Sequence, residues 1–315
     1  MTNVADFKWS KDMKLNKFTS SLGKIGFQST EIMNASNTIV KMKTEGAKIF
    51  LSFTSNMVTS GLRGFFAQLI DLKIANIIIT TVGGIEEDIM KAKGEDFPIG
   101  SFFSDDKALY ERGHNRVGNL IIKNESYEKF EDMIDPMLEK LYAKKKRYTV
   151  SELLYELGLQ LNDKNSILYQ ASKHNVPIFC PAITDGAFGF HLYSFSLKHK
   201  DFIVDVVGDF SRLLSASSYD EKKGLIALGG GVSKHHAILG TLINGGLDYA
   251  IYMTTANYTS GSMSGATTQE AKSWGKIKDD ADAVTVIGDV SVFFPLAMCG
   301  ALEELSERGV IEIKK

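Results

Sequence analysis

The sequence predicts an α/β protein with a doubly wound, mostly parallel, Rossmann-like sheet, helical cap elements and an N-terminal arm. Short runs rich in Val and Ile alternate along the chain with longer segments of helical pattern. The strand-like runs lack polar alternation, which indicates burial on both faces, as in a parallel sheet. Polar or glycine-rich residues follow most of these runs, where ligands bind in open parallel sheets.

The first elements are two strand–helix units. Residues 47–53 form the first predicted strand, and Thr54-Ser55-Asn56 supplies side-chain oxygens that can begin a helix over residues 58–72. Residues 75–81 form the second predicted strand, and the glycine pair at 83–84 opens the next helix.

The later elements continue the alternation. Residues 94–119 are rich in glycine and predict a long loop, which is often functional in a compact domain. Residues 127–146 and 150–173 have helical patterns and are expected to form a cap. The remaining strands are predicted at residues 176–179, 202–207, 224–228, 248–254 and 283–287.

The length of 315 residues is enough for one large domain or two modest ones. The apolar fraction of 44% and the charged fraction of 23% are ordinary for globular proteins, so disorder is not expected. We expect a polar arm over residues 1–25. A single α/β domain is expected over residues 26–315, with a helical insertion near 125–173.

Composition excludes several classes of protein. A net charge of −2 argues against nucleic-acid binding, and we interpret the basic run at residues 144–147 as a solvated helix end. Cys180 and Cys299 are too few for a disulfide framework or a zinc site, so we expect a reducing compartment and no metal. The start of the chain lacks a signal-peptide pattern, and the apolar stretch at 74–85 is too short to span a bilayer. We therefore expect a cytoplasmic protein without a membrane segment.

The predicted strand ends indicate a ligand site. Glycine lets a backbone approach a phosphate closely, and a following helix offers free N–H groups. Neither the Gly-x-Gly-x-x-Gly fingerprint nor a Walker-type loop is present. Spacing alone therefore predicts a nucleotide-sized ligand of unknown type. The relevant runs are residues 54–56, 80–84, 184–186, 229–231, 254–256 and 288–290.

Lys276 is a candidate nucleophile. A lysine of ordinary pKa is neutral in only about one molecule in a thousand near pH 7.4, so burial or a cationic neighbour must lower its pKa. Trp274 lies two residues away and could hold an alkylammonium by a cation–π contact, and His235 could act as a general base. An exposed lysine, a core indole and a structural histidine are the alternative interpretations. The acidic run at residues 86–88 has two interpretations. Its negative charges either stabilise the positive, N-terminal end of a helix dipole or face a cationic substrate.

Together these runs resemble deoxyhypusine synthases. The similarity extends from about residue 49 to about residue 302, and the order and spacing of the runs also fit. The shared runs are residues 54–56, 80–88, 115–120, 181–186, 229–236, 248–250, 264–266 and 273–277.

The resemblance implies a reaction and its partners. The cofactor NAD takes a hydride from spermidine or a related polyamine, and 1,3-diaminopropane is released. The aminobutyl group is carried as an imine on Lys276 and passes to a lysine of a translation initiation factor precursor, forming deoxyhypusine. The resemblance also implies a homo-oligomer, a tetramer with sites between subunits.

The resemblance further implies roles for individual residues. Lys276 and His235 would be catalytic. The residues expected to bind the cofactor are Ser55, Asn56, Thr81, Val82, Gly83, Glu87, Asp185, Gly230, Thr255, Ala256, Asp289 and Val290. The residues expected to bind the amine substrate are Glu86, His235, Gly261, Ser262, Glu270 and Trp274.

Three positions depart from the family pattern. Phe190, Met263 and Ser260 stand where acidic residues are usual, and losing a buried carboxylate opposite an ammonium typically costs a few kcal/mol. An alternative is therefore an aminobutyl transferase with a small diamine acceptor, of the homospermidine-forming kind. A further alternative is a non-catalytic, NAD-binding homologue, against which the intact Lys276, Trp274 and His235 argue.

Overall fold

The computed structural model describes residues 3–312, which divide into two compact units. Unit 1 comprises the chain up to Phe53, Ile74–Ile79 and the chain from Leu213 onward, and unit 2 comprises Thr54–Lys73 and Thr80–Arg212. The single catalytic domain expected from the sequence stays a prediction. Residues 1–2 of the expected arm and residues 313–315 of the expected domain lie outside the described part.

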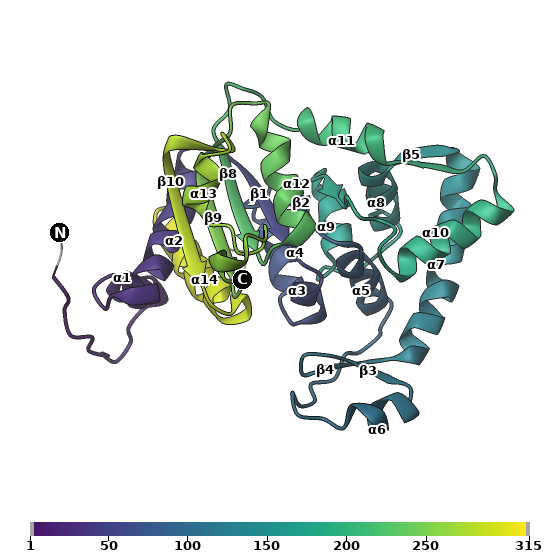
Figure 1. Ribbon diagram of the computed structural model, residues 1–315, viewed down its shortest axis with the longest axis horizontal. Helices are drawn as coiled ribbons and strands as arrows, with labels where there is room; N and C mark the ends of the chain where they lie inside the picture. Colours follow the sequence, from purple (N-terminus) through teal and green to yellow (C-terminus); the bar gives the residue numbers. More distant parts are fainter. Residues whose placement is uncertain (1–2, 313–315) are drawn as a thin grey trace. The chain divides into compact units, whose positions relative to one another are not determined.

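Unit 1 contains parallel strands in the order β10-β9-β8-β1-β2 (Figure 1). Leu51 of β1 pairs with Ile226 on one side and with Ile78 on the other. Every residue of β8 is buried, so both faces of the sheet are covered. This arrangement confirms the predicted α/β class. The strands are β1 (Lys48–Phe53), β2 (Ile77–Ile79), β8 (Lys223–Leu228), β9 (Leu247–Thr254) and β10 (Ile277–Ile287).

Helices complete unit 1. Helix α12 packs against β1, β8 and β9. Helix α2 packs against β9 and β10, and α14 packs against β9 and α2. Helix α1 lies within the predicted arm and packs on α14, where Thr19 Oγ1 donates to the carbonyl of Leu296. The helices are α1 (Leu15–Leu22), α2 (Phe27–Thr44), α12 (Gly231–Leu242), the 3₁₀ helix η1 (Tyr258–Ser260), α13 (Thr268–Lys272) and α14 (Val290–Glu307).

Unit 2 is mainly helical. Its helices are α3 (Asn56–Thr59), α4 (Arg63–Asp71), α5 (Val82–Ala92), α6 (Asp106–Glu111), α7 (Asn124–Lys144), α8 (Val150–Gly158), α9 (Ile167–His174) and α10 (Ala187–Lys198). Its strands are β3 (His114–Val117), β4 (Leu120–Lys123), β5 (Arg147–Thr149), β6 (Ile178–Phe179) and β7 (Ile203–Asp205), and α11 (Val206–Leu214) contains the boundary with unit 1.

Two predicted helices are interrupted. The helix predicted over residues 58–72 divides into α3 and α4 around Gly61, and the helix predicted over 150–173 divides into α8 and α9. At the second break, the Ser166 side chain accepts a hydrogen bond from the amide of Tyr169 and so begins α9 afresh. Such a break is hard to recognise in the sequence, because the apolar periodicity continues across it and the new helix depends on a single polar capping residue.

The predicted loop at 94–119 was wrong in part, because it contains α6 and strand β3. Strands β3 and β4 form an antiparallel hairpin around Gly118 and Asn119, where Gly118 has a φ of +63°. A two-residue Gly-Asn turn between short strands is a sequence signal for this hairpin. The strand predicted over 202–207 is also shorter, because the Asp205 carboxylate accepts from the amide of Gly208 at the start of α11.

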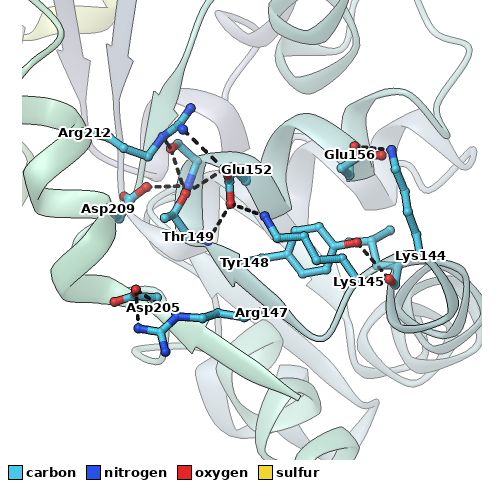
Figure 2. A network of polar contacts seen from close by, with 12 residues as sticks. Lys144, Lys145, Arg147, Tyr148, Thr149, Glu152, Glu156, Asp205, Asp209 and Arg212 are labelled. Carbon is cyan, nitrogen blue, oxygen red and sulfur yellow. Dashed lines mark hydrogen bonds and ion pairs between the residues drawn. The ribbon is translucent and has the colours of Figure 1, made fainter. Parts of the chain in front are cut away.

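The basic run at 144–147 begins at the last residue of α7, and Lys144, Lys145 and Arg147 pair with carboxylates, as Figure 2 shows. Lys144 pairs with Glu156, and Lys145 pairs with Glu152 of the capping box that begins α8. These cations therefore stabilise the local fold of unit 2. Within residues 3–312, no helix combines the length and the apolar composition needed to cross a membrane.

Candidate active site

Lys276 lies in unit 1, in the turn between α13 and β10. Gly275, with a φ of +66°, reverses the chain just before it. The Lys276 Nζ atom is 3.4 Å from His235 Nε2 and 5.0 Å from the ring centroid of Trp274. The side chain is partly buried, and this burial lowers the pKa of its ammonium group.

His235 lies on the first turns of α12, which follows the glycine-rich end of β8. Burial first, and the positive charge of Lys276 second, lower the pKa of the imidazole. A neutral imidazole can accept a proton from a neighbouring ammonium group. The structure therefore brings together three residues that the sequence singled out, Lys276, His235 and Trp274, in an arrangement suited to producing a neutral amine.

The segment between β9 and α13 holds other predicted substrate residues. We call residues 255–267 the substrate loop. Gly261 and Ser262 are exposed at its tip, and Ser262 Oγ lies 3.3 Å from Ser260 Oγ. Glu270 is exposed on α13, where its amide donates to the side chain of Thr267. The role of these residues in binding an amine stays a prediction.

The carboxyl ends of three adjacent parallel strands carry the predicted cofactor residues of unit 1. Gly230 follows β8, Thr255 and Ala256 follow β9, and Asp289 follows β10. Asp289 is exposed and begins α14, where it accepts from the amide of Ser291, and Val290 is buried behind it. These residues thus form one edge of the sheet at which a nucleotide could lie.

Unit 2 holds the remaining predicted cofactor residues. Thr81 Oγ1 accepts a hydrogen bond from the Ser55 amide, so α3 and α5 begin beside one another. Gly83 fits closely there, because a Cβ atom on it would lie 2.9 Å from the Ser55 Cβ. Asn56 is exposed and Val82 is buried. Their contacts with a cofactor stay predictions.

The neighbouring carboxyl groups of α5 are buried. Glu86 accepts hydrogen bonds from the amides of Ala187 and Phe188, so it caps α10. Burial raises the pKa of Glu86, and it raises the pKa of Glu87 to about 7. Glu87 accepts from the Thr59 hydroxyl at 2.6 Å. Asp185, by contrast, is exposed.

The sequence analysis missed three residues that shape these sites. Thr59 and Lys91 both act on Glu87, and Lys91 also donates to the carbonyls of Val58 and Thr59. Lys91 lies four residues after Glu87, a helical spacing that could have indicated the pair. Lys234 is buried beside His235, and no sequence signal separates it from an exposed lysine. Within residues 3–312, no cluster of three His, Cys, Asp or Glu residues could hold a metal ion.

The raised pKa of Glu87 predicts a pH dependence of stability. Its ordinary pKa is 4.5, so its contribution is fully present below pH 4.5 and is lost as pH rises through about 7. The glutamine of Glu87→Gln cannot titrate. Between pH 5 and pH 7 the unfolding free energy of the parent chain should therefore fall by about 2 kcal/mol more than that of the variant. Urea unfolding at several pH values measures the difference.

Glu86 is present in both proteins, and its charge contributes to the raised pKa of Glu87 in the parent chain. Lys91 has a pKa lowered from 10.5 to about 8, so its own titration raises stability only above about pH 8, outside the range compared. Parallel stability curves for the two proteins from pH 5 to pH 7 would contradict the prediction.

The chain matches known proteins over nearly its whole length. The family model described as "Deoxyhypusine synthase" matches residues 17–301. A "probable deoxyhypusine synthase" of Thermoplasma acidophilum is 40% identical over 297 residues, covering 94% of this chain and 96% of that protein. One from Schizosaccharomyces pombe is 40% identical, covering 90% and 85%. The solved structure of a proposed deoxyhypusine synthase from Entamoeba histolytica matches with a TM-score of 0.69 at 29% identity, covering 95% and 97%.

Proposed function

Because the chain belongs to the deoxyhypusine synthase family and is a transferase, we propose that it transfers the aminobutyl group of spermidine to a protein lysine in an NAD-dependent reaction. The acceptor is a lysine of a translation initiation factor precursor, and the product is deoxyhypusine. The observation that carries the proposal is the Lys276 amine, held 3.4 Å from a histidine nitrogen and beside an indole.

Lys276 acts as the nucleophile in this scheme. His235 Nε2 accepts the proton of the Lys276 ammonium, and partial burial favours the neutral amine. The face of the Trp274 ring suits the cationic amine of a substrate chain as well as the lysine itself. These residues hold the amine, remove its proton and reduce its contact with water.

The strand ends of unit 1 fit the cofactor NAD. Gly231 has a φ of +64° and no atom near its missing side chain, which leaves space for a close backbone approach. The exposed Asp289 carboxylate is the type of group that accepts hydrogen bonds from ribose hydroxyls. When bound, NAD accepts a hydride from the substrate and later returns it. Gly230, Thr255 and Asp289 would hold the dinucleotide.

The covalent steps carry the aminobutyl group through Lys276. Spermidine loses a hydride and a proton and becomes an imine. The neutral Lys276 amine adds to the imine carbon, and 1,3-diaminopropane leaves with the original nitrogen. The acceptor lysine then displaces Lys276 from the aminobutyl imine. A hydride and a proton reduce the new carbon–nitrogen double bond and complete deoxyhypusine.

A second candidate function uses a small diamine as acceptor. Phe190 is 67% exposed on α10, and Met263 is partly buried in the substrate loop, where the family usually has acids. Fewer carboxylates change how a polyamine is held, which favours a different amine partner. An NAD-binding homologue without catalysis is the remaining alternative. We also propose a homotetramer, on the family resemblance.

One experiment separates these functions. The purified chain is incubated with NAD and spermidine labelled in its butyl carbons, together with either the initiation factor precursor or putrescine. We expect label in the factor lysine and release of unlabelled 1,3-diaminopropane. Label found only in a small amine would support the second candidate instead. NAD binding without any transfer would support the non-catalytic alternative.

A further inference from the structure

Lys234, on the first turns of α12, is a buried cation that the proposed reaction does not use directly. Its side chain is 1% exposed. Its Nζ atom donates to the carbonyls of Met263 and Ala266 at 3.0 and 2.7 Å, and it lies 4.0 Å from the ring centroid of Tyr252 on β9. A buried ammonium is costly unless such partners surround it, so this arrangement fixes the positions of the two carbonyls.

Two further contacts join the same part of the substrate loop to the start of α12. The amide of Gly231 donates to Ser264 Oγ at 2.9 Å. Gly230 packs so closely that a Cβ atom on it would lie 2.4 Å from the Cα of Ser264. Residues 263–266 are therefore held against α12, whereas the loop tip at 257–262 is mostly exposed.

We propose that Lys234 is a positioning residue, which holds the substrate loop in register with His235 and Lys276 and thereby sets the affinity for the amine donor. Lys234 and His235 are consecutive on α12, and His235 Nε2 is 3.4 Å from Lys276 Nζ. The same helix turn thus fixes both the proton acceptor and the loop that carries Gly261 and Ser262. This inference rests on the proposed function for its effect on substrate, although the contacts themselves do not.

Lys234→Met removes the donors and keeps most of the side-chain volume. Lys223→Met is the matched control, because Lys223 is equally buried and its Nζ donates to the carbonyls of Ser218 and Glu221, before β8 begins. We expect Lys234→Met to raise the KM for the amine donor at least about 10-fold and to lower kcat less than about 3-fold. The control should leave the KM unchanged.

Amide hydrogen exchange gives a second readout that needs no turnover. The amides of Gly265 and Ala266 both donate to the carbonyl of Ser262 inside the loop. Lys234→Met should increase their exchange at least about 10-fold, and Lys223→Met should not. Ser264→Ala, which removes the acceptor of the Gly231 amide, should act in the same direction and serves if Lys234→Met does not fold.

The outcomes separate this inference from the proposed function. Unchanged loop exchange in both loop variants overturns the positioning role, whatever the turnover. An unchanged KM for Lys234→Met in an active enzyme overturns its effect on the amine donor. If the parent chain transfers no aminobutyl group, the proposed function and the effect on the donor fail together, while faster exchange still supports the holding of the loop.

Discussion

Replacing Lys276 by arginine should lower aminobutyl transfer by at least about 10³-fold. Arginine keeps the positive charge and much of the length, but its guanidinium does not lose a proton in proteins and cannot form the imine. The measurement is transfer of label from spermidine. Borohydride trapping during turnover should add the aminobutyl mass to the peptide that contains Lys276 in the parent chain.

Lys272→Arg is the matched control for this prediction. Lys272 ends α13, four residues before Lys276, and its Nζ donates to the carbonyl of Asp279, which an arginine can also reach. Its transfer rate should remain near that of the parent chain. A Lys276→Arg variant that retains a tenth of the parent rate, or a trapped adduct on another lysine, would contradict a nucleophilic role for Lys276.

Replacing Asp88 by alanine should reduce the unfolding free energy by about 3–5 kcal/mol. The Asp88 carboxylate is 1% exposed and accepts from Arg63 Nε at 2.6 Å and from Ser166 Oγ at 2.8 Å. It also accepts from the amides of Ile167 and Leu168 at the start of α9. Its removal leaves Arg63 with Asp163 as its remaining carboxylate partner, and it leaves the Ser166 hydroxyl and two buried amides without their acceptor. Urea unfolding measures the loss.

Asp105→Ala is the control for the buried carboxylate. Asp105 also begins a helix, α6, and accepts from the amide of Ala108, but it is exposed to solvent. Asp105→Ala should reduce the unfolding free energy by about 1 kcal/mol, as for other helix caps. If both variants lose the same amount, the network around Asp88 does not have the stabilising effect that its burial implies.

Local patterns in the sequence were sufficient for the fold class and for most elements. The runs at 47–53, 224–228 and 248–254 predicted β1, β8 and β9 almost to the residue, because a buried parallel strand needs a continuous apolar run. The sequence pattern did not reveal the breaks in the helices predicted over residues 58–72 and 150–173. A cap such as Ser166 depends on one side chain meeting one amide.

The sequence by itself determined the α/β alternation, the family and the residue types that can carry the chemistry, Lys276, His235 and Trp274. Only the tertiary structure decided that His235 lies 3.4 Å from Lys276, although 41 residues separate them. That distance follows from the order of β8, β9 and β10, which is set by hydrogen bonds between distant strands. Burial of Lys234 and Glu87 was decided in the same way, because the environment of a charged group depends on packing from elements far along the chain.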